Sequence, residues 1–174
     1  MPEQARPELS PEEEEQRQAR RTVLRWFTYG LFCVTSAAGD ETGAFTANWL
    51  SQASFDPPMV MLSVEADSHS LPVIRASGRF AINVFASGQR ELAGHFGKKT
   101  RHAGNKLEGI DYHLDRFGQP IIDEALGYVI CETTGELPAG DSVVLVANVI
   151  EAVVLASPDR TSLTMAEAGF RHAG

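Results

Sequence analysis

The sequence predicts a mainly β protein, a barrel of antiparallel strands in a Greek-key-like order with a few helices. Short runs of β-branched and aromatic residues, separated by glycine, proline and polar turns, recur between residues 31 and 156. Few segments show helical periodicity, and strands do not alternate regularly with helices as a doubly wound parallel sheet requires. A closed or nearly closed barrel is expected because closure removes exposed sheet edges.

The composition is that of one soluble globular domain. The chain has 174 residues, of which 43% are hydrophobic and 22% are charged, so it can bury a sizeable core. Its formal net charge of −8 argues against a general nucleic-acid binder, because neutralising phosphates requires a basic surface. A small anionic ligand held by a few local groups is compatible with this charge.

The sequence lacks the patterns of secretion or membrane insertion. The N-terminal residues have neither a basic region nor an apolar core of the kind found in signal peptides. The most apolar stretch, 143–156, contains Asn148 and Glu151 and is too short to span a bilayer. We therefore expect a cytoplasmic protein in which Cys33 and Cys131 are buried, reduced thiols. The histidine spacing indicates no metal site.

A polar extension, residues 1–21, leads into the first helix. Ser10 is a suitable N-cap, because a proline follows it and Glu13 completes a capping box. The helix is expected to reach about Tyr29, where Gly30 ends it. Its last turns carry apolar side chains that must pack on another surface: Val23, Leu24, Trp26 and Phe27.

The rest of the chain is read as strands, two short helices and loops. Extended segments are expected at 31–36, 43–54, 59–64, 80–85, 110–114, 120–123, 125–134, 143–150 and 153–156. A tight turn at 38–41 joins the first two. Helices are expected at 71–77, closed by Gly78, and at 89–96, and residues 97–105 form a loop.

Residues 43–61 carry the most chemical information. This segment mixes small residues, hydroxyls and amides within a strand-like region. Small residues let a backbone approach a flat heteroaromatic ring, while hydroxyls and amides donate hydrogen bonds to its heteroatoms. The alternative is a polar strand whose serines and threonine cap turns.

Two motifs in this segment, 45–49 (Phe-Thr-Ala-Asn-Trp) and 54–58 (Ser-Phe-Asp-Pro-Pro), resemble the flavin reductase-like family. That family binds FMN, or sometimes FAD, on a split β-barrel. Further matches follow in register at 31–36, 77–84, 89–96, 118–122 and 140–141. The resemblance covers about residues 23–174, so residues 22–174 are expected to form a single FMN-binding split-barrel domain.

The resemblance implies a flavin site built mainly from this segment and the helix that follows it. The candidate cofactor-binding residues are Thr46, Ala47, Asn48, Trp49, Ser51, Gln52, Ser54, Ser63, Ser68, Ser70, Arg75 and Phe96. Residues 46–49 would line the isoalloxazine ring. Ser68, Ser70 and the helix N-terminus would hold the phosphate, with Arg75 as its counter-charge. Alternatively, Ser70 only caps the helix and Arg75 lies on a solvated face.

Three further features concern a pyridine nucleotide. An acid-free basic cluster could meet its phosphates or could simply be a solvated loop: Lys98, Lys99, Arg101 and Lys106. Ser142 stands where many relatives have a histidine that receives the nicotinamide. The C-terminal segment contains Phe170, which predicts that the tail docks toward the flavin site, with Arg171 or His172 bounding the nicotinamide pocket. The alternative is a free tail.

The resemblance implies an FMN-dependent flavin reductase, a cytoplasmic homodimer that transfers hydride from NAD(P)H to flavin. Electrons would pass to free flavin, a monooxygenase or another acceptor, and no catalytic acid or base is required. One alternative is a flavoredoxin-like electron-transfer protein with little NAD(P)H activity, which Ser142 favours. Another is an interaction module that has lost its cofactor, which the intact Thr46–Asn48 motif argues against.

Overall fold

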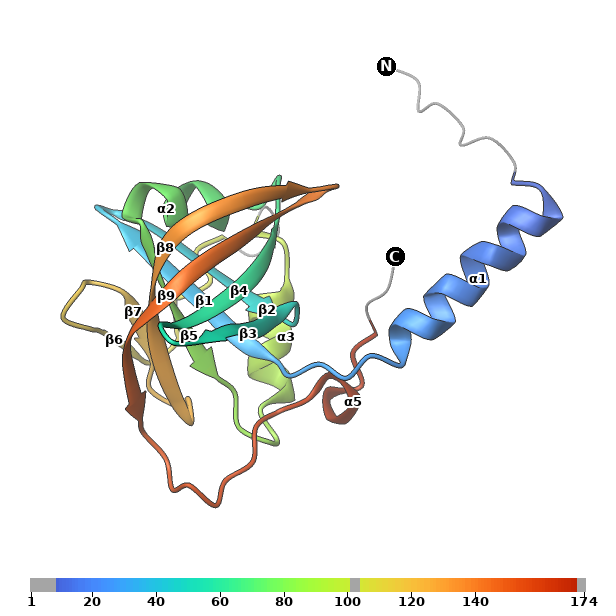
Figure 1. Ribbon diagram of the computed structural model, residues 1–174. Coiled ribbons are helices and arrows are strands. Elements are labelled where there is room, and N and C mark those ends of the chain that lie inside the picture. The colour runs from blue at the N-terminus through green and yellow to red at the C-terminus, as the bar shows by residue number, and fades with distance from the viewer. Residues whose placement is uncertain (1–8, 101–103, 172–174) are drawn as a thin grey trace.

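The computed structural model describes residues 9–100 and 104–171. Figure 1 shows a twisted sheet curved into a barrel, with one helix projecting from it. The seven-stranded sheet is antiparallel throughout, in the order β2-β1-β5-β8-β9-β4-β3. Its strands are β1 (Phe32–Ala38), β2 (Glu41–Ala47), β3 (Leu50–Phe55), β4 (Pro58–Glu65), β5 (Arg79–Val84), β8 (Gly127–Ala139) and β9 (Ser142–Val154). The mainly β, Greek-key-like prediction is confirmed.

The barrel is split rather than closed. Strands β2 and β3 are the two edges of the sheet, and within the described ranges no pairing joins one edge to the other. The chain leaves β2 after Ala47, passes through Asn48 and Trp49, and then pairs as β3 with β4 alone. The predicted extended segment 43–54 is therefore two strands, and the seam between β2 and the β3–β4 hairpin stays open.

The hairpin of β8 and β9 is longer than the sequence predicted. Strands β8 and β9 pair along their whole lengths, so the expected break near Ala152 does not occur. Instead, register shifts at Ile130/Cys131 and Thr133/Gly135 bend the hairpin while pairing continues. Pro138 is also part of β8. A small separate sheet pairs β6 (Tyr112–Leu114) with β7 (Pro120–Ile122).

Helix α1 (Pro11–Arg25) begins as predicted. Ser10 Oγ accepts a hydrogen bond from the Glu13 N–H at 3.2 Å, and Glu13 Oε2 accepts one from the Ser10 N–H at 2.8 Å. The helix ends at Arg25, earlier than expected. Gly30 is instead part of an extended bridge to Thr164.

Within the described residues, the apolar end of α1 is left largely exposed. Trp26 is 74% exposed, Phe27 is also exposed, and α1 buries none of its residues. Figure 1 shows α1 extending away from the barrel. Every helix in the described ranges is too short or too polar to traverse a lipid bilayer.

Two apolar clusters form most of the core. The first lies inside the barrel under helix α2 (Ser70–Ser77), around Leu62, Ile74 and Leu145. The second lies between β1 and helix α3 (Arg90–Gly97). Cys33 and Cys131 are buried free thiols, as expected, and lie in different clusters.

The C-terminal segment docks on the barrel. Leu163 is buried, and its carbonyl accepts a hydrogen bond from the Leu31 N–H at 3.0 Å. Helix α5 (Met165–Ala168) follows, and the Met165 N–H donates to the Tyr29 carbonyl at 3.0 Å. The prediction of a docked tail is confirmed as far as Arg171, while His172 lies outside the described residues.

Candidate functional site

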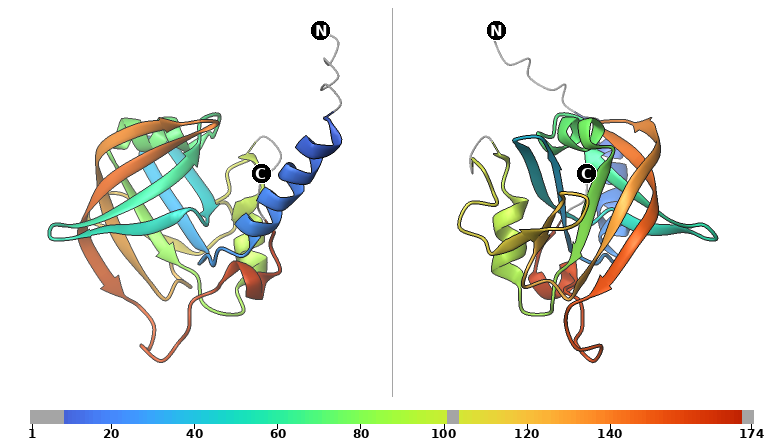
Figure 2. Two further views of the ribbon diagram at one scale, coloured as in Figure 1. Left: turned by 45° about the vertical axis from the view of Figure 1, so that its right-hand side comes forward. Right: turned by 90° about the vertical axis from the view of Figure 1, so that its left-hand side faces the viewer.

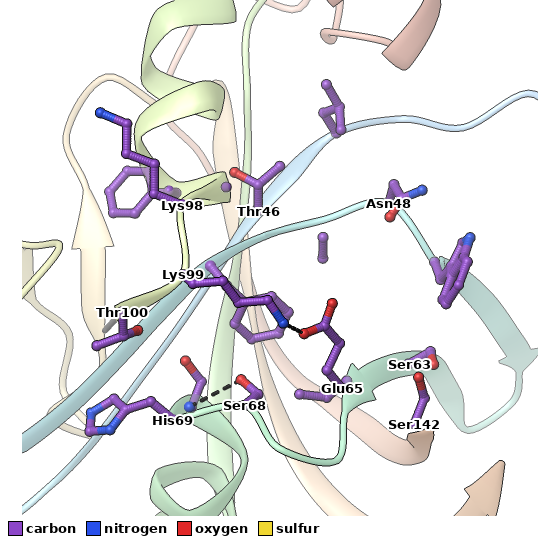
Figure 3. Close-up of a pocket in the computed structure, with 18 of the residues that line it drawn as sticks. Thr46, Asn48, Ser63, Glu65, Ser68, His69, Lys98, Lys99, Thr100 and Ser142 are labelled. Atoms are coloured by element: carbon purple, nitrogen blue, oxygen red, sulfur yellow. Dashed lines mark hydrogen bonds and ion pairs between the residues drawn. The ribbon is translucent and has the colours of Figure 1, made fainter. Parts of the chain in front are cut away.

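A cavity of about 620 Å³ lies at the open seam of the barrel (Figure 3). Its walls come from β2, the 48–49 junction, β4, the start of α2, the end of α3 and the C-terminal segment. Strand β2 lies at one end of the strand order and β4 lies next to the other end, so the cavity exists because the two edges of the sheet do not pair. Its volume is in the range of small-molecule and cofactor sites.

The wall formed by residues 46–49 is fastened to three neighbouring elements. Thr46 Oγ1 donates to the Ala93 carbonyl in α3 at 2.6 Å. Asn48 Nδ2 donates to Met165 Sδ at 3.1 Å. A main-chain hydrogen bond also connects this wall to β4, since the Trp49 carbonyl accepts from the Ser63 N–H at 2.9 Å. The wall is therefore a preorganised surface rather than a free strand end.

The start of α2 lies against β2 because Gly43 permits a close approach. A Cβ at Gly43 would lie 2.9 Å from the Cα, Cβ and Oγ atoms of Ser70. Ser70 is buried, and its N–H donates to Ser68 Oγ at 3.2 Å. The His69 ring is held by the Thr42 carbonyl at 3.2 Å. Ser68, His69 and Ser70 all line the cavity, beside the positive end of the helix dipole.

Three lysines also line the cavity, together with the carboxylates Glu65 and Asp67. Lys98 and Lys99 lie on the rim, where Lys99 pairs with Glu65 of β4 (Figure 3). Lys106 lines the cavity from a buried position, and its Nζ donates to the Phe96 carbonyl at 2.9 Å. Burial lowers the pKa of Lys106. The predicted basic cluster thus reaches the cavity through three lysines, while Arg101 lies outside the described residues.

The structure brings most of the sequence-predicted site residues to this one cavity. Those that line it are Thr46, Ala47, Asn48, Trp49, Ser63, Ser68, Ser70 and Phe96. Phe170 and Arg171 of the docked tail also line it, as does Ser142. The Ser142 hydroxyl donates to Asp141 Oδ1 at 3.0 Å, so it is oriented by its own neighbour.

Four predicted residues lie away from the cavity. Ser51, Gln52 and Ser54 are on β3, which turns away after Trp49, and Figure 2 shows the β3–β4 hairpin projecting beyond the barrel. Gln52 Nε2 donates to the Ser54 carbonyl at 3.2 Å. Arg75 forms two hydrogen bonds with Glu136, at 3.0 and 2.9 Å. Because it follows Ser70 by more than one helical turn, Arg75 lies outside the cavity lining.

Sequence reasoning missed several lining residues. Glu65 and Thr100 border the rim, and Leu31 and Met165 contribute apolar surface. Met165 carried no local signal, because only the docking of α5 places it beside Asn48. Glu65 ends β4 on the side of the seam, which strand alternation alone does not reveal.

The residues present fit a flat, phosphorylated heteroaromatic ligand. Phe96, Ala47 and Met165 supply apolar surface, and hydroxyl and amide groups supply neutral hydrogen-bonding partners. Serines at a helix N-terminus and nearby lysines suit an anionic end. Among the described residues, no cluster of His, Cys, Asp or Glu side chains is arranged to hold a metal ion.

The class of protein is therefore a split antiparallel β-barrel whose open seam holds a cavity of cofactor size. A sequence model of the flavin reductase-like domain matches residues 24–174, and the chain belongs to that family. The resemblance seen in residues 45–58 is thereby confirmed.

Individual relatives agree with this assignment. The reductase subunit HsaB of a flavin-dependent monooxygenase from Mycobacterium tuberculosis is 32% identical over 125 residues, which cover 72% of this chain and 65% of HsaB. The shared segment therefore spans slightly less than two thirds of that relative.

Solved structures are similar over more of their length. The NADH:FAD oxidoreductase SgcE6 of Streptomyces globisporus, in complex with NAD and FAD fragments, superposes with a TM-score of 0.78 at 27% identity, covering 97% of this chain and 98% of that one. A homologue of nitrilotriacetate monooxygenase component B from Mycobacterium thermoresistibile gives 0.76 at 30% identity, covering 88% and 83%.

Proposed function

We propose that this protein is an FMN-binding flavin reductase that transfers hydride from NAD(P)H to flavin. The observation that carries the proposal is the seam cavity, which combines the polar wall 46–49, apolar surface at Phe96 and a cationic side. The named functions of HsaB and SgcE6 support it. When bound, the flavin supplies the capacity to accept and release a hydride.

The chain's own residues bind and orient in this proposal. Ser68 and Ser70 hold the phosphate with the N-terminal amides of α2, where the helix dipole favours negative charge. Thr46 and Asn48 hold the wall in place through their hydrogen bonds to Ala93 and Met165. Phe96 excludes water from one side of the cavity. Positioning of two ligands, rather than proton abstraction, is the main demand on the protein.

The proposal extends to the domain boundary, partners and assembly. Residues 22–174 form the flavin domain, FMN is preferred to FAD, and NADH or NADPH is the co-substrate. The acceptor is free flavin or a monooxygenase component, as the name of HsaB suggests. The protein is a cytoplasmic homodimer in which a partner covers exposed apolar side chains, among them Trp26 just after α1 and the 88% exposed Phe55.

A second candidate is an electron-transfer flavoprotein of the flavoredoxin kind. Ser142 favours it, since this buried residue lines the cavity at the position where the family resemblance implies a histidine. Such a protein would bind FMN equally well but oxidise NAD(P)H poorly. The two candidates therefore differ in one measurable step, the reduction of the bound flavin by NAD(P)H.

Absorption spectroscopy of the purified protein tests the proposal. We expect flavin absorption in the protein as purified, or quenching of FMN fluorescence at micromolar concentration with one FMN per chain. Anaerobic addition of NADH or NADPH should then bleach the flavin band. Bleaching by dithionite but not by either nucleotide would favour the electron-transfer protein, and no binding of FMN or FAD would overturn both candidates.

A further inference from the structure

The cavity lining includes a buried cationic side chain that has no part in holding the wall residues 46–49 in place. Lys106 is only 6% exposed, although lysine is among the residues least often buried. Its side chain lines the cavity beside Phe96. Placing an ammonium group out of water costs free energy unless other groups compensate its charge.

Within the described ranges, that compensation is incomplete. Lys106 Nζ forms one hydrogen bond, to the Phe96 carbonyl, although an ammonium group has three donors. No described carboxylate lies within ion-pair distance of it, and the nearby Glu65 is paired with Lys99. The neighbouring Cys33 thiol is not a counter-ion, because burial raises its pKa and keeps it protonated.

Contacts of the Lys106 carbonyl and of the next residue, Leu107, fix the main chain at this position. The His95 ring donates to the Lys106 carbonyl from Nε2 at 2.7 Å. The next residue, Leu107, is buried in the apolar cluster between β1 and α3, and its N–H donates to Asn105 Oδ1 at 3.1 Å. The ammonium group is therefore preorganised on the cavity wall, unlike the exposed Lys98 on the rim.

We propose that the Lys106 ammonium compensates an anionic oxygen of the flavin bound in this cavity. This inference rests on the proposed function and deepens it by assigning a binding residue. The anionic oxygen has two sources in one ligand class: the phosphate of FMN, or the ring oxygen that carries charge when the flavin is reduced. A cation fixed before binding stabilises either one without reorganisation.

Lys106→Met is the test, with Arg160→Met as the control that removes one positive charge from an exposed position outside the cavity lining. FMN and riboflavin affinities are measured by fluorescence quenching, and the midpoint potential of bound flavin by dye-coupled titration. If the phosphate is the source, Lys106→Met weakens FMN about tenfold or more and leaves riboflavin nearly unchanged. If the reduced ring is the source, the midpoint potential becomes more negative with both flavins. Arg160→Met changes each value less than threefold.

Lys106→Gln separates charge from hydrogen bonding, because its amide still offers an N–H to the Phe96 carbonyl, and it replaces Lys106→Met if that variant does not fold. The proposal expects the same losses in Lys106→Gln and their recovery in Lys106→Arg. It is overturned if the uncharged variants keep the parent's FMN-to-riboflavin ratio and midpoint potential. A parent protein that binds no flavin would instead overturn the proposed function, so the two failures are distinct.

Discussion

Asn48 and Met165 are 117 residues apart in the chain, yet Asn48 Nδ2 donates a hydrogen bond to Met165 Sδ at 3.1 Å. This contact joins the wall of the cavity, at the β2–β3 junction, to helix α5. The Phe170 N–H in turn donates to the Met165 carbonyl at 3.1 Å, so the last described residues are positioned by the wall that they face. The C-terminal segment is therefore part of the site.

Removing the end of the C-terminal segment should reduce NAD(P)H oxidation more than it weakens FMN binding. Deletion of residues 169–174 removes Phe170 and Arg171 from the cavity lining but leaves α2 and the 46–49 wall intact. We expect unchanged FMN affinity and NAD(P)H oxidation reduced at least severalfold, measured by fluorescence titration and steady-state kinetics. Arg160→Ala, an exposed change in the same segment, is the control. A truncated protein equal to the parent in both assays would show that the tail has no role.

Gly43→Ala should disturb the phosphate end of the cavity. The added Cβ would lie 2.9 Å from three atoms of Ser70, so α2 or β2 must move, at a cost of about 1–3 kcal/mol of stability. Weaker FMN binding should accompany this loss. Gly135→Ala is the matched control, because a Cβ there meets nothing within 4 Å. Denaturant unfolding and FMN titration measure both effects, and equal results for the two variants would contradict the prediction.

Ser70→Ala and Arg75→Ala should differ in their effect on FMN binding. Ser70 lines the cavity, and loss of a hydrogen bond to a phosphate should cost about 1.5–3 kcal/mol of FMN binding with little effect on riboflavin. Arg75 is engaged by Glu136 on the surface, where solvent screens such pairs. We expect Arg75→Ala to leave both affinities unchanged. A selective loss of FMN binding in Arg75→Ala would restore it as a phosphate ligand.

Alkaline pH should destabilise the fold through its buried thiols. Burial raises the pKa of Cys131 from 9.0 to about 12. A raised folded-state pKa means that stability is complete below pH 9 and is lost as the pH rises toward 12, because only the unfolded thiol ionises. Between pH 8 and pH 10 this one group should cost about 1.5 kcal/mol. Urea unfolding of the parent and Cys131→Ala at both values tests this, since the variant should lose correspondingly less stability.

The residues that local chemistry governs were predictable. The Ser10–Glu13 capping box needs only four consecutive residues, and Gly78 ends α2 in the left-handed conformation at φ 69°. The family resemblance likewise rests on contiguous motifs within 45–58, and these motifs include the wall that the structure places at the cavity. Local hydrogen bonding and conformational preference act over a few residues, so the sequence alone determined these features.

Tertiary structure decided which of the candidate residues meet. Ser51 and Arg75 lie near the site in sequence but outside the cavity, because β3 pairs with β4 and Glu136 approaches from β8. Met165 and Lys106 line it from distant segments that local patterns did not connect with the wall. Strand pairing, helix docking and burial of charge depend on contacts between segments far apart in the chain. Those contacts form only when the barrel folds, and its open seam is what creates the cavity.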